Sequence, residues 1–206
     1  MNLADIRKDY QSRVLDETTV SADPFVQFLS WMDEAVKSEV EEPTAMHLAT
    51  ADSEGRPSGR MVLLKGVENG GFVFFTNYDS KKGKDLAQNP YAALTFFWPE
   101  LERQVRIEGR VRRLPRNESV HYFSGRPRES RLGAHASPQS RPVPDRKWLD
   151  EAFRHANERF CGEVPCPENW GGFVVVPERF EFWQGRQGRM HDRLLYQDGK
   201  ILRLAP

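Results

Sequence analysis

Cysteine is scarce in this chain of 206 residues, which holds only Cys161 and Cys166. The two lie too far apart for a Cys-x-x-Cys redox pair, and no histidines follow at zinc-finger spacing. We therefore expect two reduced, structural thiols and no metal site. A Gly-x-Gly-x-x-Gly run after a strand is also missing, which argues against a dinucleotide-binding Rossmann unit.

Long apolar runs and an excess of one charge are missing as well. No apolar stretch is long enough to span a bilayer, and the N-terminus has no signal-peptide core, so we expect a cytoplasmic protein with no membrane contact. Lysine plus arginine (30) balances aspartate plus glutamate (30), and the aromatic residues fall in predicted strands. This pattern disfavours an arginine-rich RNA-binding domain, and no nucleic-acid partner is expected.

The pattern of apolar residues predicts a mainly β chain with peripheral helices, an α+β fold. Helices are expected after the N-caps Asp23, Ser80 and Asp145, and a shorter one begins near residues 115–118. The chain length suits one domain, residues 23–206, preceded by a polar, mobile arm at residues 1–22. About seven or eight strands with antiparallel connections are expected, among them 44–50, 59–65, 72–77, 91–98, 173–176 and 180–183.

Basic side chains gather after the predicted strand at residues 180–183. Gly185 and Gly188 break that strand, and Arg186, Arg189, His191 and Arg193 follow with no apolar periodicity. Guanidinium groups fit phosphate through a planar pair of donors, so an anion site is one interpretation. A solvated charged rim is the other.

A second set of polar side chains recurs at intervals of four, at Tyr122, Arg126 and Ser130. The spacing places them close to one face if the chain stays near-helical, but Pro127 favours a turn between two helices. A phenol, a guanidinium and a hydroxyl together suit a phosphate dianion, since each charge-assisted hydrogen bond contributes about 1.5–3 kcal/mol.

The order Glu181-Phe182-Trp183-Gln184, then Arg189-Met190-His191-Asp192-Arg193, resembles the C-terminal signature of the pyridoxine (pyridoxamine) 5′-phosphate oxidases. The resemblance extends from Arg7 to Pro206. It implies an FMN-binding split β-barrel of antiparallel Greek-key type, assembled as a homodimer with FMN in clefts between the subunits. The implied activity is that of a pyridoxal 5′-phosphate synthase, which oxidises pyridoxine and pyridoxamine 5′-phosphates with O2 and releases H2O2.

The resemblance also assigns roles to residues. The catalytic pair it implies is Arg189 and His191, with His191 the acid/base candidate because histidine titrates near neutral pH. Substrate-binding residues by resemblance are Arg7, Tyr10, Lys65, Tyr122, Arg126, Ser130, Arg189 and His191, of which Arg7 and Tyr10 belong to an arm that closes as a lid. FMN-binding residues by resemblance are Arg60, Met61, Val62, Leu63, Leu64, Lys65, Phe75, Thr76, Lys81, Lys82, Gln104, Gln139, Ser140, Trp183 and Arg193.

Two features of this assignment are open from sequence alone. Strand alternation places Arg60 and Lys65 on opposite faces unless a strand end or bulge intervenes between them. Lys81 stands where the family usually has arginine, so one guanidinium is lost at the flavin phosphate. Two other functions also stay open, namely a split-barrel flavin oxidoreductase with another substrate and a non-catalytic carrier of FMN or pyridoxal phosphate.

Overall fold

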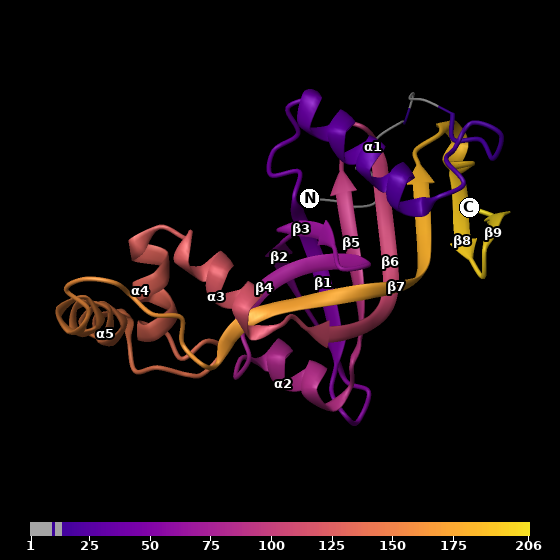
Figure 1. The fold of residues 1–206 in the computed structure, drawn as a ribbon. Coiled ribbons are helices and arrows are strands. Elements are labelled where there is room, and N and C mark those ends of the chain that lie inside the picture. Colours follow the sequence, from indigo (N-terminus) through magenta and orange to yellow (C-terminus); the bar gives the residue numbers. More distant parts are fainter. Residues whose placement is uncertain (1–9, 11–13) are drawn as a thin grey trace, which may run out of the picture.

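The structure, a computed structural model, describes Tyr10 and residues 14–206, and a curled antiparallel sheet forms its centre (Figure 1). The described strands are β1 (Ala45–Ala51), β2 (Pro57–Leu63), β3 (Gly66–Glu68), β4 (Gly71–Asn77), β5 (Tyr91–Trp98), β6 (Arg103–Arg113), β7 (Trp170–Gln184), β8 (Asp192–Gln197) and β9 (Lys200–Arg203). The described helices are α1 (Pro24–Lys37), α2 (Lys81–Gln88), α3 (Arg116–Ser124), α4 (Arg128–Ala136), α5 (Arg146–Arg159) and a short 3-10 helix, Gln187–Arg189.

The sheet curls until its two edges meet. Its strand order is β2-β1-β5-β6-β7-β4-β3, with β8 and β9 added beside β7, so the edge strands β2 and β3 are consecutive in the chain. The N–H of Leu64 donates to Thr44 O at 2.8 Å on one side, and the N–H of Lys65 donates to Val73 O at 2.8 Å on the other. Lys65 therefore lies beyond the end of β2, at the point where β2 continues into β3, which we call the seam of the barrel. Because the strand ends between Arg60 and Lys65, strand alternation does not force their side chains onto opposite faces.

Strand β7 is longer than the sequence predicts. Residues 173–176 and 180–183 were expected as two strands, but they form one strand of 15 residues that runs through Pro177. Pro177 has no N–H, and it pairs with Gly109 where the β6–β7 register shifts. A bulge therefore accommodates the proline without ending the strand.

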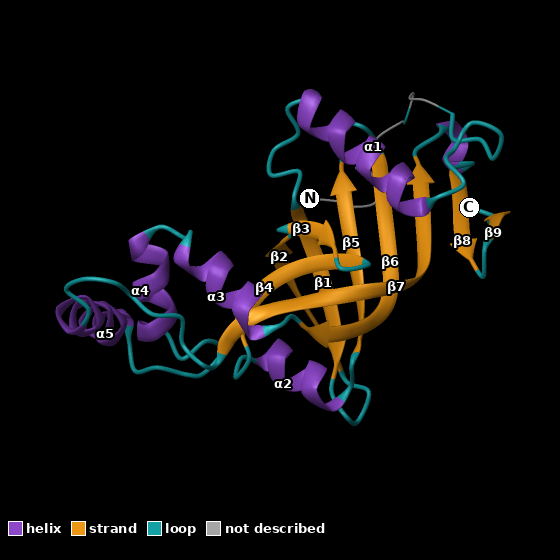
Figure 2. Ribbon diagram, viewed as in Figure 1, coloured by secondary structure: helices purple, strands orange, loops and turns teal. Residues whose placement is uncertain are grey.

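Helices cover the barrel ends and extend to one side (Figure 2). As predicted, Asp23 caps α1 by accepting from the N–H of Phe25, and α1 buries Phe28 and Trp31 in the main core. Helices α4 and α5 and the segment after α5 share a separate small core of Leu132, Ala156 and Val164.

The apolar side chains of α5 are only partly covered in the protomer. Trp148 is 38% exposed and Phe153 is 36% exposed, and only Ala156 among the helix residues is buried. Phe160, directly after the helix, packs against the small core of Leu132, Ala156 and Val164.

The predicted arm is described only at Tyr10 and from residue 14 onward, so the expectation for Arg7 lies outside the described residues. The described end is attached to the barrel, because Leu15 is buried and Tyr196 Oη donates to Ser21 O at 2.8 Å. The mobility of the arm stays a prediction. No helix within the described ranges is long and apolar enough to cross a membrane.

We predict opposite effects for two glycine substitutions. A Cβ at Gly109 would lie 2.0 Å from Val176 O, so Gly109→Ala should destabilise the bulge by about 1–3 kcal/mol. A Cβ at Gly133 on α4 would meet nothing within 4 Å, so Gly133→Ala should stabilise the helix by about 0.5–1 kcal/mol. Thermal unfolding at equal protomer concentration measures both. A wild-type Tm for Gly109→Ala would contradict the account of the bulge.

Candidate functional site

A cavity of about 970 Å³ opens beside the seam of the barrel. Four predicted site residues line it, each from a different segment: Lys65 from the seam, Phe75 from β4, Tyr122 from α3 and Arg126 from the turn after α3. The structure therefore brings together four residues that are far apart in the sequence. The cavity combines two cations, a phenol and an aromatic wall.

The aromatic wall is a stack of nearly parallel rings. The rings of Phe75 and Tyr122 lie 3.8 Å apart at 7°, and Phe75 lies 5.4 Å from Trp170 at 11°. The guanidinium of Arg126 lies over Trp170, 4.7 Å from the ring centre. Planar groups therefore hold Arg126 in place from one side.

The Arg126 side chain is half-buried, and its guanidinium is incompletely paired. Its Nη1 has no hydrogen-bond partner, and burial lowers the pKa of Arg126 from its usual value. Burial also raises the pKa of Tyr122, so that this phenol keeps its proton at neutral pH. An unpaired buried guanidinium nitrogen is costly, and an anion in the cavity would relieve that cost.

The expected break between two helices is confirmed, since α3 ends at Ser124 and α4 begins at Arg128, directly after Pro127. Ser130 lies on α4, is exposed, and is not among the residues that line the cavity. The structure thus brings together two of the three residues predicted from the spacing of four. The role of Ser130 stays a prediction.

A cluster of cations lies at the N-terminus of α2. Ser80 caps the helix by accepting from the N–H of Gly83, as predicted. Lys82 is 7% exposed, and its Nζ lies 3.3 Å from the hydroxyl of Thr76. Burial, then the positive charge of Arg60, lowers the pKa of Lys82. A largely buried ammonium beside a guanidinium and a helix N-terminus is a favourable place for a phosphate.

Lys81 has a different partner from Lys82. Its Nζ lies 2.8 Å from Asp85 Oδ1, one turn along α2. Asp85 is 3% exposed, and its other oxygen accepts from the hydroxyl of Thr50 at 2.8 Å and lies 3.9 Å from Arg60 Nη2. The side chain of Lys81 is therefore directed to a carboxylate in the protomer.

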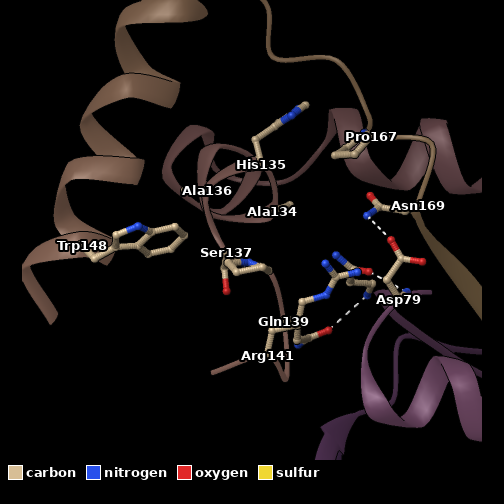
Figure 3. Close-up of a pocket in the computed structure, with 12 residues that line it drawn as sticks. Asp79, Ala134, His135, Ala136, Ser137, Gln139, Arg141, Trp148, Pro167 and Asn169 are labelled. Atoms are coloured by element: carbon tan, nitrogen blue, oxygen red, sulfur yellow. Dashed lines mark hydrogen bonds between the residues drawn. The ribbon is translucent and has the colours of Figure 1, made fainter. Parts of the chain in front are cut away.

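The loop after α4 reaches this cluster through Gln139. Its Oε1 accepts from the Thr76 hydroxyl at 3.0 Å and from the N–H of Asn77 at 3.2 Å. Figure 3 shows Gln139 at the edge of a cavity of about 380 Å³, opposite the hydrogen-bonded pair Asn169 and Asp79. Ser140, its neighbour, is exposed and has a left-handed φ of 70°.

Met61, Val62 and Leu63 lie on β2 and Leu64 directly follows it, whereas another group of predicted residues lies at the far end of β7. Register places Gln104 opposite Trp183, and Trp183 opposite Arg193, so three predicted FMN residues lie side by side on β6, β7 and β8. Arg193 Nε donates to Glu181 Oε1 at 2.8 Å. Glu181 is 7% exposed, and it also accepts from Arg106 at 3.1 Å.

The His191 ring lies beside Trp183, with 4.7 Å between ring centres, and Tyr10 lies 5.6 Å from both rings. The N–H of Arg186 donates to His191 Nδ1 at 3.0 Å, so the neutral ring carries its proton on Nε2. Burial, then Arg189, lowers the pKa of His191. At neutral pH His191 is therefore an uncharged ring that offers a donor at Nε2.

The two groups of residues do not form one pocket in a single protomer. Phe75 pairs with Gly172 near the start of β7, whereas Trp183 lies near its end, on the order of 36 Å farther along an extended strand. Lys65 and Arg126 share the large cavity, and Arg189 does not line it. One protomer therefore carries two half-sites, which we call the seam half-site (with Lys65 and Arg126) and the β7-end half-site (with Trp183 and His191).

Several residues of these half-sites were not predicted. Trp170 supports Arg126 but has no motif of its own in the sequence. The sequence could have indicated Glu181, because a carboxylate between Phe180 and Phe182 in an apolar strand needs a charged or hydrogen-bonding partner when it is buried. Nothing in the sequence indicates that Asp85 is buried, since its place on a polar helix is typical of a solvated residue.

Comparison with known proteins identifies the family. A family model described as pyridoxamine 5′-phosphate oxidase matches residues 32–159, and one described as the pyridoxine 5′-phosphate oxidase C-terminal dimerisation region matches residues 170–206. A pyridoxine/pyridoxamine 5′-phosphate oxidase of Neisseria gonorrhoeae is 52% identical over 205 residues, 98% of each chain. One of Ectopseudomonas mendocina is 54% identical over 198 residues, 95% of this chain and 92% of the relative.

Solved structures agree on the fold. PhzG from Burkholderia lata, in complex with tetrahydrophenazine-1-carboxylic acid, matches with a TM-score of 0.90 at 28% identity over 97% of this chain and 100% of that chain. A pyridoxamine 5′-phosphate oxidase-related, FMN-binding protein of Nostoc punctiforme matches with a TM-score of 0.70 at 18% identity over 89% of this chain and 97% of that chain. The predicted split β-barrel is thus confirmed, and the chain belongs to the pyridoxamine 5′-phosphate oxidase family of oxidoreductases.

Proposed function

We propose that the chain oxidises pyridoxine 5′-phosphate and pyridoxamine 5′-phosphate to pyridoxal 5′-phosphate, with FMN as cofactor and O2 as the electron acceptor that becomes H2O2. The observation that carries the proposal is the guanidinium of Arg126, whose buried Nη1 has no hydrogen-bond partner, in a cavity with Lys65 and Tyr122. Relatives above 50% identity bear the name of this oxidase. A phosphorylated substrate supplies the anion that the cavity requires.

The residues at the N-terminus of α2 fit the phosphate of FMN. Lys82 and Arg60 are largely buried cations, and the Lys82 ammonium has the Thr76 hydroxyl within 3.3 Å. Free N–H groups in the first turn of α2 add donors. FMN bound there would take up the two electrons of the oxidation and pass them to O2.

A homodimer would unite the two half-sites. The β7-end half-site falls within residues 170–206, the region matched to a dimerisation model. Apolar side chains are exposed nearby on the sheet, with Met61 61% exposed and Phe97, which pairs with Gln104, 52% exposed. A second copy that covers this face would bring its Trp183, Arg189 and His191 to the seam half-site.

The protein residues then have distinct tasks. Lys65, Tyr122 and Arg126 bind the substrate phosphate, with Ser130 as a further donor. Arg189 and His191 orient the pyridine ring of the substrate. Because Nδ1 of His191 accepts from a backbone N–H, the neutral ring is suited to donate from Nε2 to a substrate oxygen. This refines the acid/base role expected for His191 to a hydrogen-bond donor at neutral pH.

A second candidate function follows from the similarity to PhzG, whose structure contains a tetrahydrophenazine carboxylic acid. That ligand has no phosphate, so a protein that binds it does not need a cation at the position of Arg126 to bind one. A non-catalytic carrier is the third candidate. Both are tested by the purified protein: it should be yellow, pyridoxine 5′-phosphate should bleach it without air, and readmitted O2 should yield peroxide. A coloured protein that is not bleached would contradict the proposal.

Substitutions should separate binding from turnover. Arg126→Ala should raise KM for pyridoxine 5′-phosphate about 10- to 100-fold, from the loss of one or two charge-assisted bonds. The same variant should oxidise unphosphorylated pyridoxine as the wild type does. Arg189→Ala and His191→Ala should lower kcat while FMN stays bound. Arg146→Ala on the exposed surface of α5 is the control, and unchanged kcat/KM in all three site variants would refute the assignment.

Mixed dimers should reveal a shared site. Arg126→Ala and Arg189→Ala remove different half-sites, so each homodimer should lack efficient sites. When the two variants are co-expressed, half of the dimers should be mixed, each with one intact site, and about a quarter of wild-type activity should return. Mixed dimers isolated with two affinity tags should then have about half of wild-type activity. No recovery above the parent variants would mean that each site lies within one protomer.

Removing the charge of Arg189 should raise the pKa of His191. Arg189 lowers that pKa through like-charge repulsion, so Arg189→Gln should shift it upward, towards its ordinary value. The ring of His191 would then gain its proton at a higher pH than in the wild type. NMR titration of the imidazole measures this, with Arg146→Gln as the matched control. A downward shift would contradict the proximity of the two side chains.

A further inference from the structure

The carboxylate of Asp192, the first residue of β8, binds three separate parts of the chain. Its Oδ1 lies 2.7 Å from Arg203 Nη1 on β9. Its Oδ2 lies 3.1 Å from Arg186 Nη1 in the loop after β7, and it accepts the N–H of Leu15 at 3.1 Å. The side chain is only 13% exposed, so these bonds are partly shielded from water.

On the side of the loop, Arg186 is held twice. Its guanidinium binds Asp192, and its backbone N–H binds His191 Nδ1. Between these contacts the backbone is left-handed at two successive residues, Gly188 (φ 64°) and Arg189 (φ 62°). Such a φ is unfavourable for arginine and persists only where neighbouring contacts impose it. The Asp192–Arg186 ion pair is one contact that closes the loop.

On the other side, the same carboxylate holds the N-terminal segment. Arg203 Nη2 donates to Leu15 O at 3.1 Å, and both oxygens of Glu17 bind Arg203, at 2.7 and 2.6 Å. The Leu15 side chain is 4% exposed in the main core. Residue 15 is therefore fixed in position relative to β8 and β9.

Tyr10 lies a short way before this anchor, against the edges of Trp183 and His191. Gly185, at the start of the loop, makes room for it, since a Cβ there would lie 2.8 Å from Tyr10 Cγ. The N-terminal segment and the loop thus meet twice, at Asp192 and at the ring of His191.

We infer that Asp192 is a positioning residue that couples the docking of the N-terminal segment, through Leu15 and Tyr10, to the conformation of the loop that carries Arg189 and His191. The significance of this coupling for turnover rests on the proposed function. The coupling itself is a property of the chain, because it concerns contacts among its own residues. Asp192 acts through its neighbours and does not contact the substrate.

Asp192→Asn is the informative change, because it keeps the shape and removes the charge. The amide has one oxygen for three donors, and its NH2 group would face a guanidinium. Arg203 keeps its hydrogen bonds to both oxygens of Glu17, so β9 and the segment at Leu15 should lose less stability than the loop that contains Arg186. We therefore expect the loop and His191 to loosen while the barrel stays folded.

The test uses the FMN-loaded dimer and two readouts. ¹⁵N NMR of His191 should show the Nε2–H tautomer in the wild type and a mixture of tautomers in Asp192→Asn. The kcat/KM for pyridoxine 5′-phosphate should fall about tenfold or more in Asp192→Asn. Asp192→Glu, which keeps the charge, should partly restore both the Nε2–H tautomer of His191 and kcat/KM. Asp33→Asn, the same change in an exposed ion pair of α1, is the matched control and should alter neither.

A double-mutant cycle with Tyr10→Ala tests the coupling. If Asp192 acts through the docked segment, Asp192→Asn should lower kcat/KM by a much smaller factor in the Tyr10→Ala background than in the wild type. Two outcomes would overturn the inference. One is that the two substitutions lower kcat/KM by independent factors that multiply in the double variant. The other is that Asp192→Asn lowers the Tm but leaves the His191 resonances as in the wild type. If the wild type shows no oxidase activity, the proposed function fails, while the NMR readout still decides whether Asp192 positions His191.

Discussion

The continuous pairing of β7 is the constraint from which the rest of the site follows. The strand has 15 residues, of which residues 170–175 pair with β4 and residues 179–184 pair with β8, while β6 pairs with β7 from residue 173 to residue 184. Residues at its two ends therefore cannot meet within the protomer. Phe75 and Trp183, which both belong to the expected flavin site, are held apart by the same sheet that fixes each in place. A shared site between two copies, as proposed, would bring the two groups together without any change in fold.

The seam of the barrel performs a second structural task. A sheet whose edges are β2 and β3 has unpaired N–H groups unless those edges are joined. The N–H of Leu64 bonds to Thr44 O, just before β1, and the N–H of Lys65 bonds to Val73 O on β4, so the backbone at this point is fixed on both sides. The Lys65 side chain is therefore presented from a rigid position, although it lies in a connection between strands. Rigid support of this kind limits the entropy lost when a side chain binds a phosphate.

Much of the fold could be predicted from the sequence because it depends on local rules. Helix caps at Asp23, Ser80 and Asp145 form as expected, and Pro127 separates two helices. The length of β7 could not be predicted, since Pro177 normally signals an end and only its pairing with Gly109 at a bulge permits continuation.

The candidate site divides in the same way. Motif order predicts roles for Arg126, Lys82 and His191, because the chemistry of each of these side chains suits the role. It did not identify Trp170 or Asp192, because their roles come from tertiary contacts. Trp170 lies over 40 residues from Arg126, and Asp192 binds residues near both ends of the chain. Sequence spacing contains no record of such contacts.

The charges around α2 give an independent reason to expect an anion there. Arg60, Lys81 and Lys82 stand near Asp85, whose single negative charge can neutralise only one of them. Lys81 is half exposed and can rely on water, but Arg60 and Lys82 are largely buried, and Arg60 lowers the pKa of Lys82. Two like charges so placed destabilise the empty fold, and a phosphate dianion between them would remove the repulsion. We therefore expect lysine in place of arginine at position 81 to change phosphate binding little. The ammonium of Lys81 already binds Asp85, and the largely buried Arg60 and Lys82 supply most of the attraction for a phosphate.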